Sequence, residues 1–359
     1  MASVRVISGV GAKAPAAFLV EANGVRLLLD LGEGPTPGVR PDLSGAGPVD
    51  AIVLSHSHID HAGALDLHET LDCPHVFATA LTWQSLAQSR IPAVYRHLLP
   101  LHGVGMVVGT PVRTGRTGHS PDGIWVHLAV GDGLLYTGDW SVESELIPCD
   151  QPPPAATVIT DASYGDRDEP LIHQIEALAT TVIHGAVLPV PENGRGPEMV
   201  LQLARHGLRP LACPVVCAEI ERLFRAKRET ALSERDRELL RAAVTESAVD
   251  GAMRPDRVVI ATDATADSAT TGLLARHDEF SFVFTGHVAS GTAGDRLLRD
   301  GTARMMAWNV HPRRRDVVAL VERSKASQVL PAFCPRGEMP ILEAELGDRV
   351  VWESDISVP

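Results

Sequence analysis

Three histidines and one aspartate fall within the six residues from His56 to His61. The four side chains are those of His56, His58, Asp60 and His61. Imidazole nitrogens and carboxylate oxygens are ligands that zinc and related divalent cations accept. A polar turn that happens to be rich in histidine is the alternative, but such crowding has little structural purpose. The spacing therefore predicts ligands that converge on two neighbouring cations.

Two further polar side chains follow apolar runs later in the chain. His119 lies in the sequence Thr-Gly-His-Ser and Asp139 lies in the sequence Thr-Gly-Asp. Either residue alone is typical of a turn. Together they supply the ligands that the first cluster lacks, so we expect all six residues to contribute to one metal centre.

The histidine-rich segment follows a short apolar run, Ala51–Leu54, that is typical of a buried strand. Loops at the carboxyl ends of such strands are where sites are commonly built. Upstream, Val4–Ile7, Phe18–Glu21 and Val25–Leu31 have the pattern of strands, and Asn23-Gly24 fits a hairpin turn. The chain is therefore expected to begin with an antiparallel sheet.

From about residue 169 the pattern changes to helices that alternate with apolar strands, which is typical of a parallel α/β unit. The expected helices are Leu171–Thr181, Pro197–His206 and Leu232–Val244, and the expected strands are Val187–Val190, Val258–Thr262 and Phe280–Thr285. A helix from Arg313 to Arg323 and a strand from Gln328 to Phe333 would return to the first sheet. We therefore expect a first domain over residues 1–168, an inserted domain over residues 169–300 and a return segment over residues 301–359.

The series His-x-His-x-Asp-His, Gly-His and Thr-Gly-Asp resembles the ligand series of the metallo-β-lactamase superfamily. The resemblance covers residues 4–139 and implies an αββα sandwich. It implies that one zinc is held by His56, His58 and His119, the second by Asp60 and His61, and both by Asp139. Two such cations would share a hydroxide, lower its pKa toward neutrality and stabilise charge that develops on the substrate. Asp60 would also orient that hydroxide.

Four later segments are similar to motifs of the β-CASP nucleases, a metallo-β-lactamase group with an inserted α/β domain. The segments are Val158–Gly165, Ala186–Glu198, Phe284–Thr292 and Trp308–His311. By this resemblance His311 would protonate the leaving oxygen and Asp161 would orient His311. A histidine whose pKa lies near neutrality suits a reaction that expels an alkoxide. Without the resemblance, a helix-capping or core histidine would be the preferred interpretation of His311.

The sequence departs from the family where the last metal-binding histidine is expected. Phe333 stands at that position and cannot bind a metal. Cys334 could supply a thiolate if the strand slipped by one residue, although a buried thiol without such a role is favoured. The second cation would then keep Asp60, His61, Asp139 and solvent, which predicts weaker retention. The inserted segment also looks shorter than is usual for β-CASP nucleases, which is compatible with smaller substrates.

Several residues are candidates for binding a phosphate of the substrate. Arg195 lies in a Gly-Arg-Gly loop and Arg313 follows His311 closely, and arginine makes bidentate contacts with phosphate. The backbone and hydroxyls of Ser290, Gly291 and Thr292 could form an anion-binding turn. The alternative for each arginine is a solvated helix face or loop.

Composition limits the partners. A formal net charge of −13 argues against a broadly basic surface for nucleic acid, so a polyanion must be held locally. The sequence contains neither an apolar run of about 18 residues nor an evident export signal, so a cytoplasmic protein without a membrane span is expected. Five scattered cysteines fit reduced thiols. A homo-oligomer is compatible with the sequence.

The preferred hypothesis is a zinc-dependent hydrolase, with Mn²⁺ as an alternative metal, that cleaves RNA or single-stranded DNA by a metal-bound hydroxide. A second hypothesis keeps the hydrolytic centre but takes a small ester, lactone, thioester or nucleotide as substrate. A third is a catalytically weakened binding or scaffold homologue. The third ranks last because a decayed centre should have lost some of the six predicted ligands, and none is missing.

Overall fold

The computed structural model describes residues 2–225, 232–249 and 251–359. The chain divides into two compact units, which are described separately. The first unit comprises Met1–Val142, Cys149–Asp168 and His311–Pro359, and the second comprises Glu143–Pro148 and Glu169–Val310. Within the described residues, no helix combines the length and the hydropathy that a membrane span requires.

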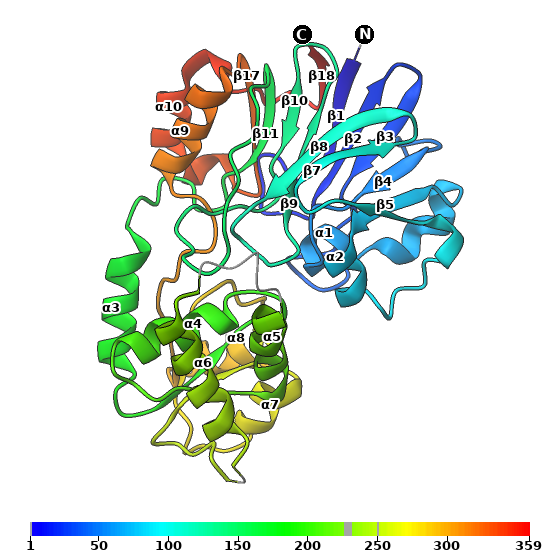
Figure 1. Ribbon diagram of the computed structural model, residues 1–359. Helices are drawn as coiled ribbons and strands as arrows, with labels where there is room; N and C mark the ends of the chain where they lie inside the picture. The colour runs from blue at the N-terminus through cyan, green and yellow to red at the C-terminus, as the bar shows by residue number, and fades with distance from the viewer. Residues whose placement is uncertain (1, 226–231, 250) are drawn as a thin grey trace. The chain divides into compact units, whose positions relative to one another are not determined.

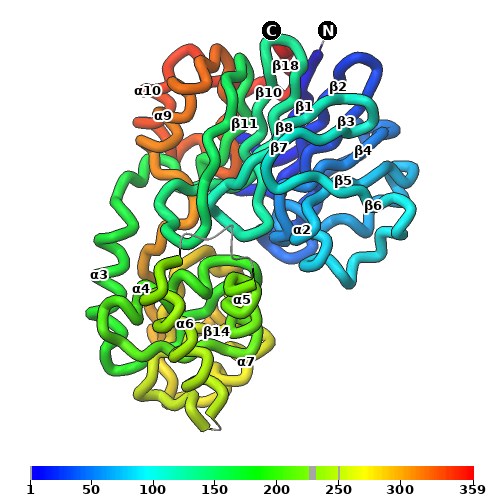
Figure 2. Tube along the Cα trace, in the orientation of Figure 1, coloured from blue at the N-terminus to red at the C-terminus, as the bar shows by residue number. Residues whose placement is uncertain are grey.

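The first unit contains two sheets (Figure 1). Across the first sheet the strands are β18 (Asp355–Val358), β1 (Ala2–Ser8), β2 (Ala17–Ala22), β3 (Val25–Leu29), β4 (Ala51–Val53), β5 (His75–Thr79) and β6 (Arg96–Leu99). The first and last strands of the chain, β1 and β18, pair antiparallel. From β3 to β6 the pairing is parallel, and the trace in Figure 2 shows these strands following one another across the sheet.

The second sheet lies against the first. Its strands, in order, are β17 (Gln328–Ala332), β11 (Thr157–Asp161), β10 (Leu134–Tyr136), β9 (Ile124–Leu128), β8 (Thr110–Arg116) and β7 (Gly103–Val107). Strands β10, β11 and β17 are parallel, so their carboxyl ends meet at one edge of the sheet. Asp139 comes shortly after β10 and Asp161 is the last residue of β11, so both lie at that edge.

Alternation of side chains along the strands builds the layers. In β3, Leu27 and Leu29 face a core shared by the two sheets, whereas Leu28 faces the opposite side. Helices α1 (Ile59–Ala62) and α2 (Ala80–Ser85) lie near the outer face of the first sheet, and α9 (Arg314–Ser324) and α10 (Pro340–Leu346) cover the outer face of the second. The expected α/β sandwich fold is therefore confirmed.

The second unit has a parallel sheet of five strands. Their order is β13 (Leu211–Ala212), β14 (Val258–Ala261), β12 (Ala186–Pro189), β15 (Phe282–Phe284) and β16 (Ala303–Met305). Its helices are α3 (Leu171–Thr181), α4 (Gly196–Arg205), α5 (Pro214–Arg225), α6 (Glu234–Ser247), α7 (Ala269–Leu274) and α8 (Ala293–Arg299). Strands β12 and β14 are buried along their whole length, as a parallel sheet covered on both faces requires.

The direction of strand addition reverses beside β12. The chain adds β13 and β14 on one side of β12 and then β15 and β16 on the other. Loops that leave the carboxyl ends of strands at such a reversal diverge and open a crevice that often binds ligands. Here those loops carry Arg195, after β12, and residues 286–292, after β15.

Candidate metal centre

The first four candidate ligands come from one strand, loop and helix. His56 and His58 follow β4, and α1 begins directly after His58, whose backbone is extended. Asp60 and His61 therefore lie on the first turn of α1. A close approach fixes this turn, because a Cβ on Gly32 would lie 1.8 Å from the Asp60 carbonyl oxygen. Only glycine fits at position 32.

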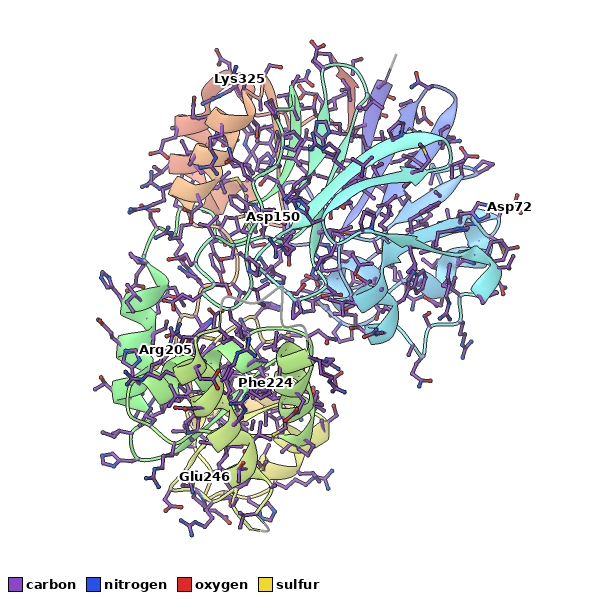
Figure 3. All side chains as sticks on the ribbon, viewed as in Figure 1. Asp72, Asp150, Arg205, Phe224, Glu246 and Lys325 are labelled. Carbon is purple, nitrogen blue, oxygen red and sulfur yellow. The ribbon has the colours of Figure 1, made fainter. Side chains whose placement is uncertain are left out.

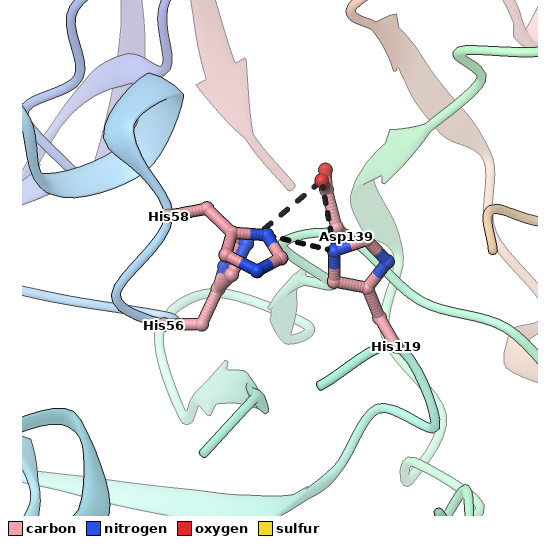
Figure 4. A group of neighbouring side chains, drawn as sticks. All are labelled: His56, His58, His119 and Asp139. Atoms are coloured by element: carbon pink, nitrogen blue, oxygen red, sulfur yellow. Dashed lines mark hydrogen bonds and ion pairs between the residues drawn. The ribbon is translucent and has the colours of Figure 1, made fainter. Parts of the chain in front are cut away.

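Four side chains form the first ligand group, shown in Figure 4. Nε2 of His56 lies 3.9 Å from Oδ2 of Asp139, and Nε2 of His119 lies 3.5 Å from the same oxygen. Nδ1 of His58 lies 3.1 Å from Nε2 of His119. One ligand atom from each of the four residues lies within 4.8 Å of the others. The structure thus brings His56, His58, His119 and Asp139 together from three separate loops.

This donor set fits a metal ion. Nε2 of His56 and Nε2 of His58 are buried and have no hydrogen-bond partner among the described residues. Burial, together with the nearby His61 and His58, lowers the pKa of His56 well below its ordinary value. A buried imidazole nitrogen without a hydrogen-bond partner destabilises the fold. A metal cation, however, binds to the free lone pair of a neutral imidazole, so this arrangement suits a metal site.

Asp60, His61 and Asp139 form a second group that shares Asp139 with the first. Nε2 of His61 lies 3.1 Å from Oδ1 of Asp139. Burial alone would lower the pKa of His61, but the carboxylates of Asp139, Asp60 and Asp30 raise it well above its ordinary value. This group offers three protein ligands, one fewer than the first.

Phe333, rather than Cys334, faces the second group. The Phe333 ring packs edge-on against the His61 ring, with centroids 5.1 Å apart, and belongs to the core between the sheets. Cys334 is buried among residues of the second sheet and its covering helices. Burial raises the pKa of its thiol to about 12, and its Sγ donates to the Pro335 carbonyl. Cys334 is therefore not placed to replace the histidine that the family carries.

We expect the two ligand groups to differ in metal affinity. When zinc-loaded protein is dialysed against increasing concentrations of a weak chelator, one equivalent should leave well before the other. Phe333→His should retain the first-released equivalent at least about tenfold more tightly, since even the loss of an outer-shell contact costs 10- to 100-fold in affinity. Metal content after dialysis measures this, and Phe77→His in the same core provides a control. Simultaneous release of both equivalents from the natural protein would contradict the expectation.

A carboxylate that the sequence interpretation missed orients His61. Asp30 is fully buried after β3 and lies 2.7 Å from Nδ1 of His61. It also accepts hydrogen bonds from the backbone N–H and hydroxyl of Ser55, both at 2.6 Å, and from the Tyr136 hydroxyl at 2.5 Å. These contacts hold the ring so that Nε2 is directed toward Asp139. The sequence did contain a signal for Asp30: it is an acidic residue directly after the apolar strand β3, which lies parallel to β4.

Asp30→Asn should weaken metal binding at the Asp60 and His61 side by about 10- to 100-fold, because the ring loses the carboxylate that fixes its tautomer and orientation. Binding at the His56, His58 and His119 side should change less. A zinc titration followed by a chromophoric competitor resolves the two steps. Asp50→Asn, in which an exposed carboxylate at the start of β4 is replaced, serves as the control. Equal weakening of both steps would count against this role for Asp30.

Asp161 and His311 lie beside the candidate metal ligands. Nδ1 of His311 is 2.8 Å from Oδ2 of Asp161 and 3.6 Å from Oδ2 of Asp139. Asp161 is fully buried and accepts a hydrogen bond from the Ser163 backbone at 2.8 Å. The Tyr164 ring packs edge-on against the His311 ring. Burial lowers the pKa of His311, but Asp161 and Asp139 outweigh it and raise that pKa above its ordinary value.

The remaining candidates lie in different surroundings. Arg313 donates two hydrogen bonds to Asp316 at the start of α9. In the second unit, Thr292 caps α8, and the Gly291 N–H donates to the Asp295 carboxylate, while Ser290 is exposed. Arg195 is buried against Gly286, where a Cβ would lie 2.2 Å from its Nη2. Of these candidates in the second unit, Arg195 is therefore the one whose side chain is buried, in the loop after β12.

A buried glutamate supports the loop that carries Arg195. The Glu219 carboxylate accepts a hydrogen bond of 2.6 Å from the Asn193 backbone, and Arg222 donates to the Asn193 side chain at 3.0 Å. The second oxygen of Glu219 has no partner among the described residues. Burial consequently raises the pKa of Glu219 from 4.5 to about 7, despite the Asn193 hydrogen bond.

This pKa predicts a pH-dependent stability. Because the folded state holds the Glu219 proton more tightly than the unfolded state, the contribution of Glu219 to stability is fully present below pH 4.5 and is lost as the pH rises through about 7. Between pH 4.5 and 7 the free energy of unfolding of the natural protein should fall by about 2–3 kcal/mol because of Glu219, and this fall should be absent in Glu219→Gln. Urea unfolding at several pH values measures it, with Glu221→Gln on the exposed side of α5 as the control. An unchanged pH profile in Glu219→Gln would refute the prediction.

Comparison with known proteins agrees with this geometry. Residues 26–175 match the family model described as the β-lactamase superfamily domain. The chain therefore carries a metallo-β-lactamase domain. It is 30% identical to Ribonuclease TTHA0252 of Thermus thermophilus over 234 residues, which is 55% of this chain and 54% of that protein. It is 27% identical to an RNase J-like protein of Methanocaldococcus jannaschii over 211 residues, which is 51% of this chain and 49% of that protein.

These relatives are named as a ribonuclease and as an RNase J-like protein, at modest identity, and the chain spans about half the length of each. A crystal structure of a protein of unknown function from Enterococcus faecalis V583 has the same fold. It superposes with a TM-score of 0.60 at 13% sequence identity and covers 99% of both chains. The recognition of this superfamily from the spacing of histidines and aspartates is thus confirmed.

Proposed function

We propose that this protein is a metal-dependent phosphodiesterase of the β-CASP type that cleaves RNA or single-stranded DNA, with zinc as its metal and manganese as an alternative. The observation that carries the proposal is the His311–Asp161 pair at 2.8 Å, beside a group of metal-binding side chains. A protonated imidazole held by a buried carboxylate suits a substrate whose leaving oxygen is a poor leaving group. The alkoxide expelled from a phosphodiester is of that kind.

Each residue has a separate part in this proposal. His56, His58, His119 and Asp139 hold one cation, and Asp60, His61 and Asp139 hold the other, more weakly. Bound cations supply Lewis acidity, which activates water and offsets charge on the phosphoryl group. Asp60 orients the attacking water, His311 donates a proton to the leaving oxygen, and Asp161 keeps the His311 ring aligned.

The relatives support a nucleic-acid substrate, since two of them are named as ribonucleases. The net charge of −13 gives no general attraction for a polyanion. Contact with the phosphates must therefore be local, and we assign it to Arg195 and the turn of Ser290, Gly291 and Thr292 in the second unit and to Arg313 in the first.

The test uses the full chain loaded with zinc and, separately, with manganese. Labelled RNA and single-stranded DNA of one sequence are incubated with the natural protein, His58→Ala and His184→Ala. His184 is exposed and distant in sequence from every proposed ligand, so its replacement should leave cleavage unchanged. His58→Ala should lose about 10³-fold or more in rate. Cleavage by His58→Ala at the natural rate, or failure of the loaded protein on both polymers, would refute the proposal, and turnover of only a small ester would indicate the smaller-substrate hydrolase.

A further inference from the structure

The loop from Gly9 to Ala16 is fixed at both ends to the metal centre. The Phe333 N–H donates to the Gly9 carbonyl at 2.6 Å, and the Ala16 N–H donates to the Asp60 carbonyl at 2.9 Å. Asp60 belongs to the ligand group that lacks a fourth protein ligand, and the Phe333 ring packs against His61 of the same group. The loop therefore runs along the weaker side of the centre.

Lys13 lies in the middle of this loop. Four carboxylates act on the Lys13 ammonium in the direction that raises its pKa. In decreasing order of effect they are those of Asp60, Asp139, Asp161 and Glu338. Desolvation lowers the pKa of Lys13, and these carboxylates oppose that effect. Three of the four belong to the proposed centre, so the charge of Lys13 acts on that centre.

The Lys13 ammonium is not used by the fold. Its side chain is exposed, and within the described ranges no carboxylate forms an ion pair with it and no hydrogen bond engages it. An arginine or lysine that serves only the fold is usually paired, as Arg205 is with Asp236. When cations bind the carboxylates, the attraction that these exert on Lys13 is offset, and the ammonium becomes available to an anion.

We propose that Lys13 binds an anionic oxygen of the substrate on the Asp60 side of the centre. This proposal rests on the proposed phosphodiesterase function, in which the substrate carries such an oxygen. Lysine is a compact point charge with three donors, suited to a single phosphate oxygen. The Lys13 ammonium would add positive charge beside the group of Asp60, His61 and Asp139. A cation held weakly by that group would provide only part of the positive charge that the anionic oxygen needs.

The experiment measures binding of inorganic phosphate to the zinc-loaded full chain by titration calorimetry. Lys13→Met should weaken phosphate binding by about 10- to 100-fold, as expected for the loss of one charged hydrogen bond. Lys13→Arg should largely retain the affinity. Lys325→Met, at the end of α9 (labelled in Figure 3), is the matched control and should bind phosphate as the natural protein does.

Metal content separates this role from a structural one. Because an ammonium repels cations, Lys13→Met should hold as much zinc as the natural protein, or more. Unchanged phosphate affinity in Lys13→Met, absence of phosphate binding by the natural protein, or loss of zinc from Lys13→Met would each overturn the proposal. Phosphate binding that depends on Lys13, in a protein that cleaves neither RNA nor single-stranded DNA, would refute the proposed function while leaving this anion site intact.

Discussion

Asp139→Ala should abolish hydrolysis, with a loss of about 10³-fold or more. The carboxylate of Asp139 belongs to both proposed ligand groups. Within the described residues it also lies in a further group, with Asp161 and His311, that could hold a metal, and it is 3% exposed. Its removal takes a ligand from both proposed cations, so metal content should fall together with activity. Metal analysis after dialysis and the rate of RNA cleavage measure the two effects.

The control for this prediction is Asp132→Ala. Asp132 is exposed in the hairpin between β9 and β10, on the same sheet, so its loss should change neither metal content nor rate. Circular dichroism of both variants checks that the fold is retained. If Asp139→Ala kept two equivalents of zinc and its normal rate, the centre would have to lie elsewhere.

His311→Ala should lose about 10²- to 10⁴-fold on RNA, the range that general acid catalysis contributes. The same variant should lose less than about tenfold on bis(4-nitrophenyl) phosphate, because nitrophenolate leaves without needing a proton. Metal content should remain unchanged, since His311 belongs to neither proposed ligand group and its Nδ1 lies 2.8 Å from Oδ2 of Asp161. The comparison of two leaving groups therefore isolates proton donation from metal binding.

Two further variants sharpen this test. Asp161→Asn should show the same dependence on the leaving group, more weakly, because the ring loses its orienting carboxylate. His173→Ala, at an exposed position of α3, should behave as the natural protein. An equal loss on both substrates in His311→Ala would assign His311 to the metal centre instead of to the leaving oxygen.

Local patterns in the sequence predicted much of the secondary structure. The helix expected at Leu171–Thr181 occupies those residues, and the Asn23-Gly24 turn has the positive φ angles that such a hairpin requires. The helix expected from Leu232 begins instead at Glu234, because Ser233 forms a capping box with Asp236. Strands β6 and β7 were not identified, since exposed apolar residues, Leu98 in β6 and Val104 and Met106 in β7, blur the alternation that marks a strand.

The sequence by itself predicted the ligand types of the proposed centre. Ligand types and their spacing are local properties, so His56, His58, Asp60 and His61 were identifiable before any fold was known. Residues that act through space were not identifiable in that way. Asp30 is 31 positions from His61, and Lys13 is 47 positions from Asp60, and neither spacing forms a motif.

The tertiary structure alone decided which of Phe333 and Cys334 faces the Asp60 and His61 side of the proposed centre. The sequence left open whether Phe333 or Cys334 would face His61, because a shift of one residue turns every side chain of a strand to the opposite face. Packing resolves this, since the Phe333 ring belongs to the core between the sheets and the Cys334 thiol lies on the far side of the second sheet. Burial of successive side chains on opposite faces of the second sheet therefore determines that Phe333 faces His61. The spacing of the ligands along the sequence could not determine this.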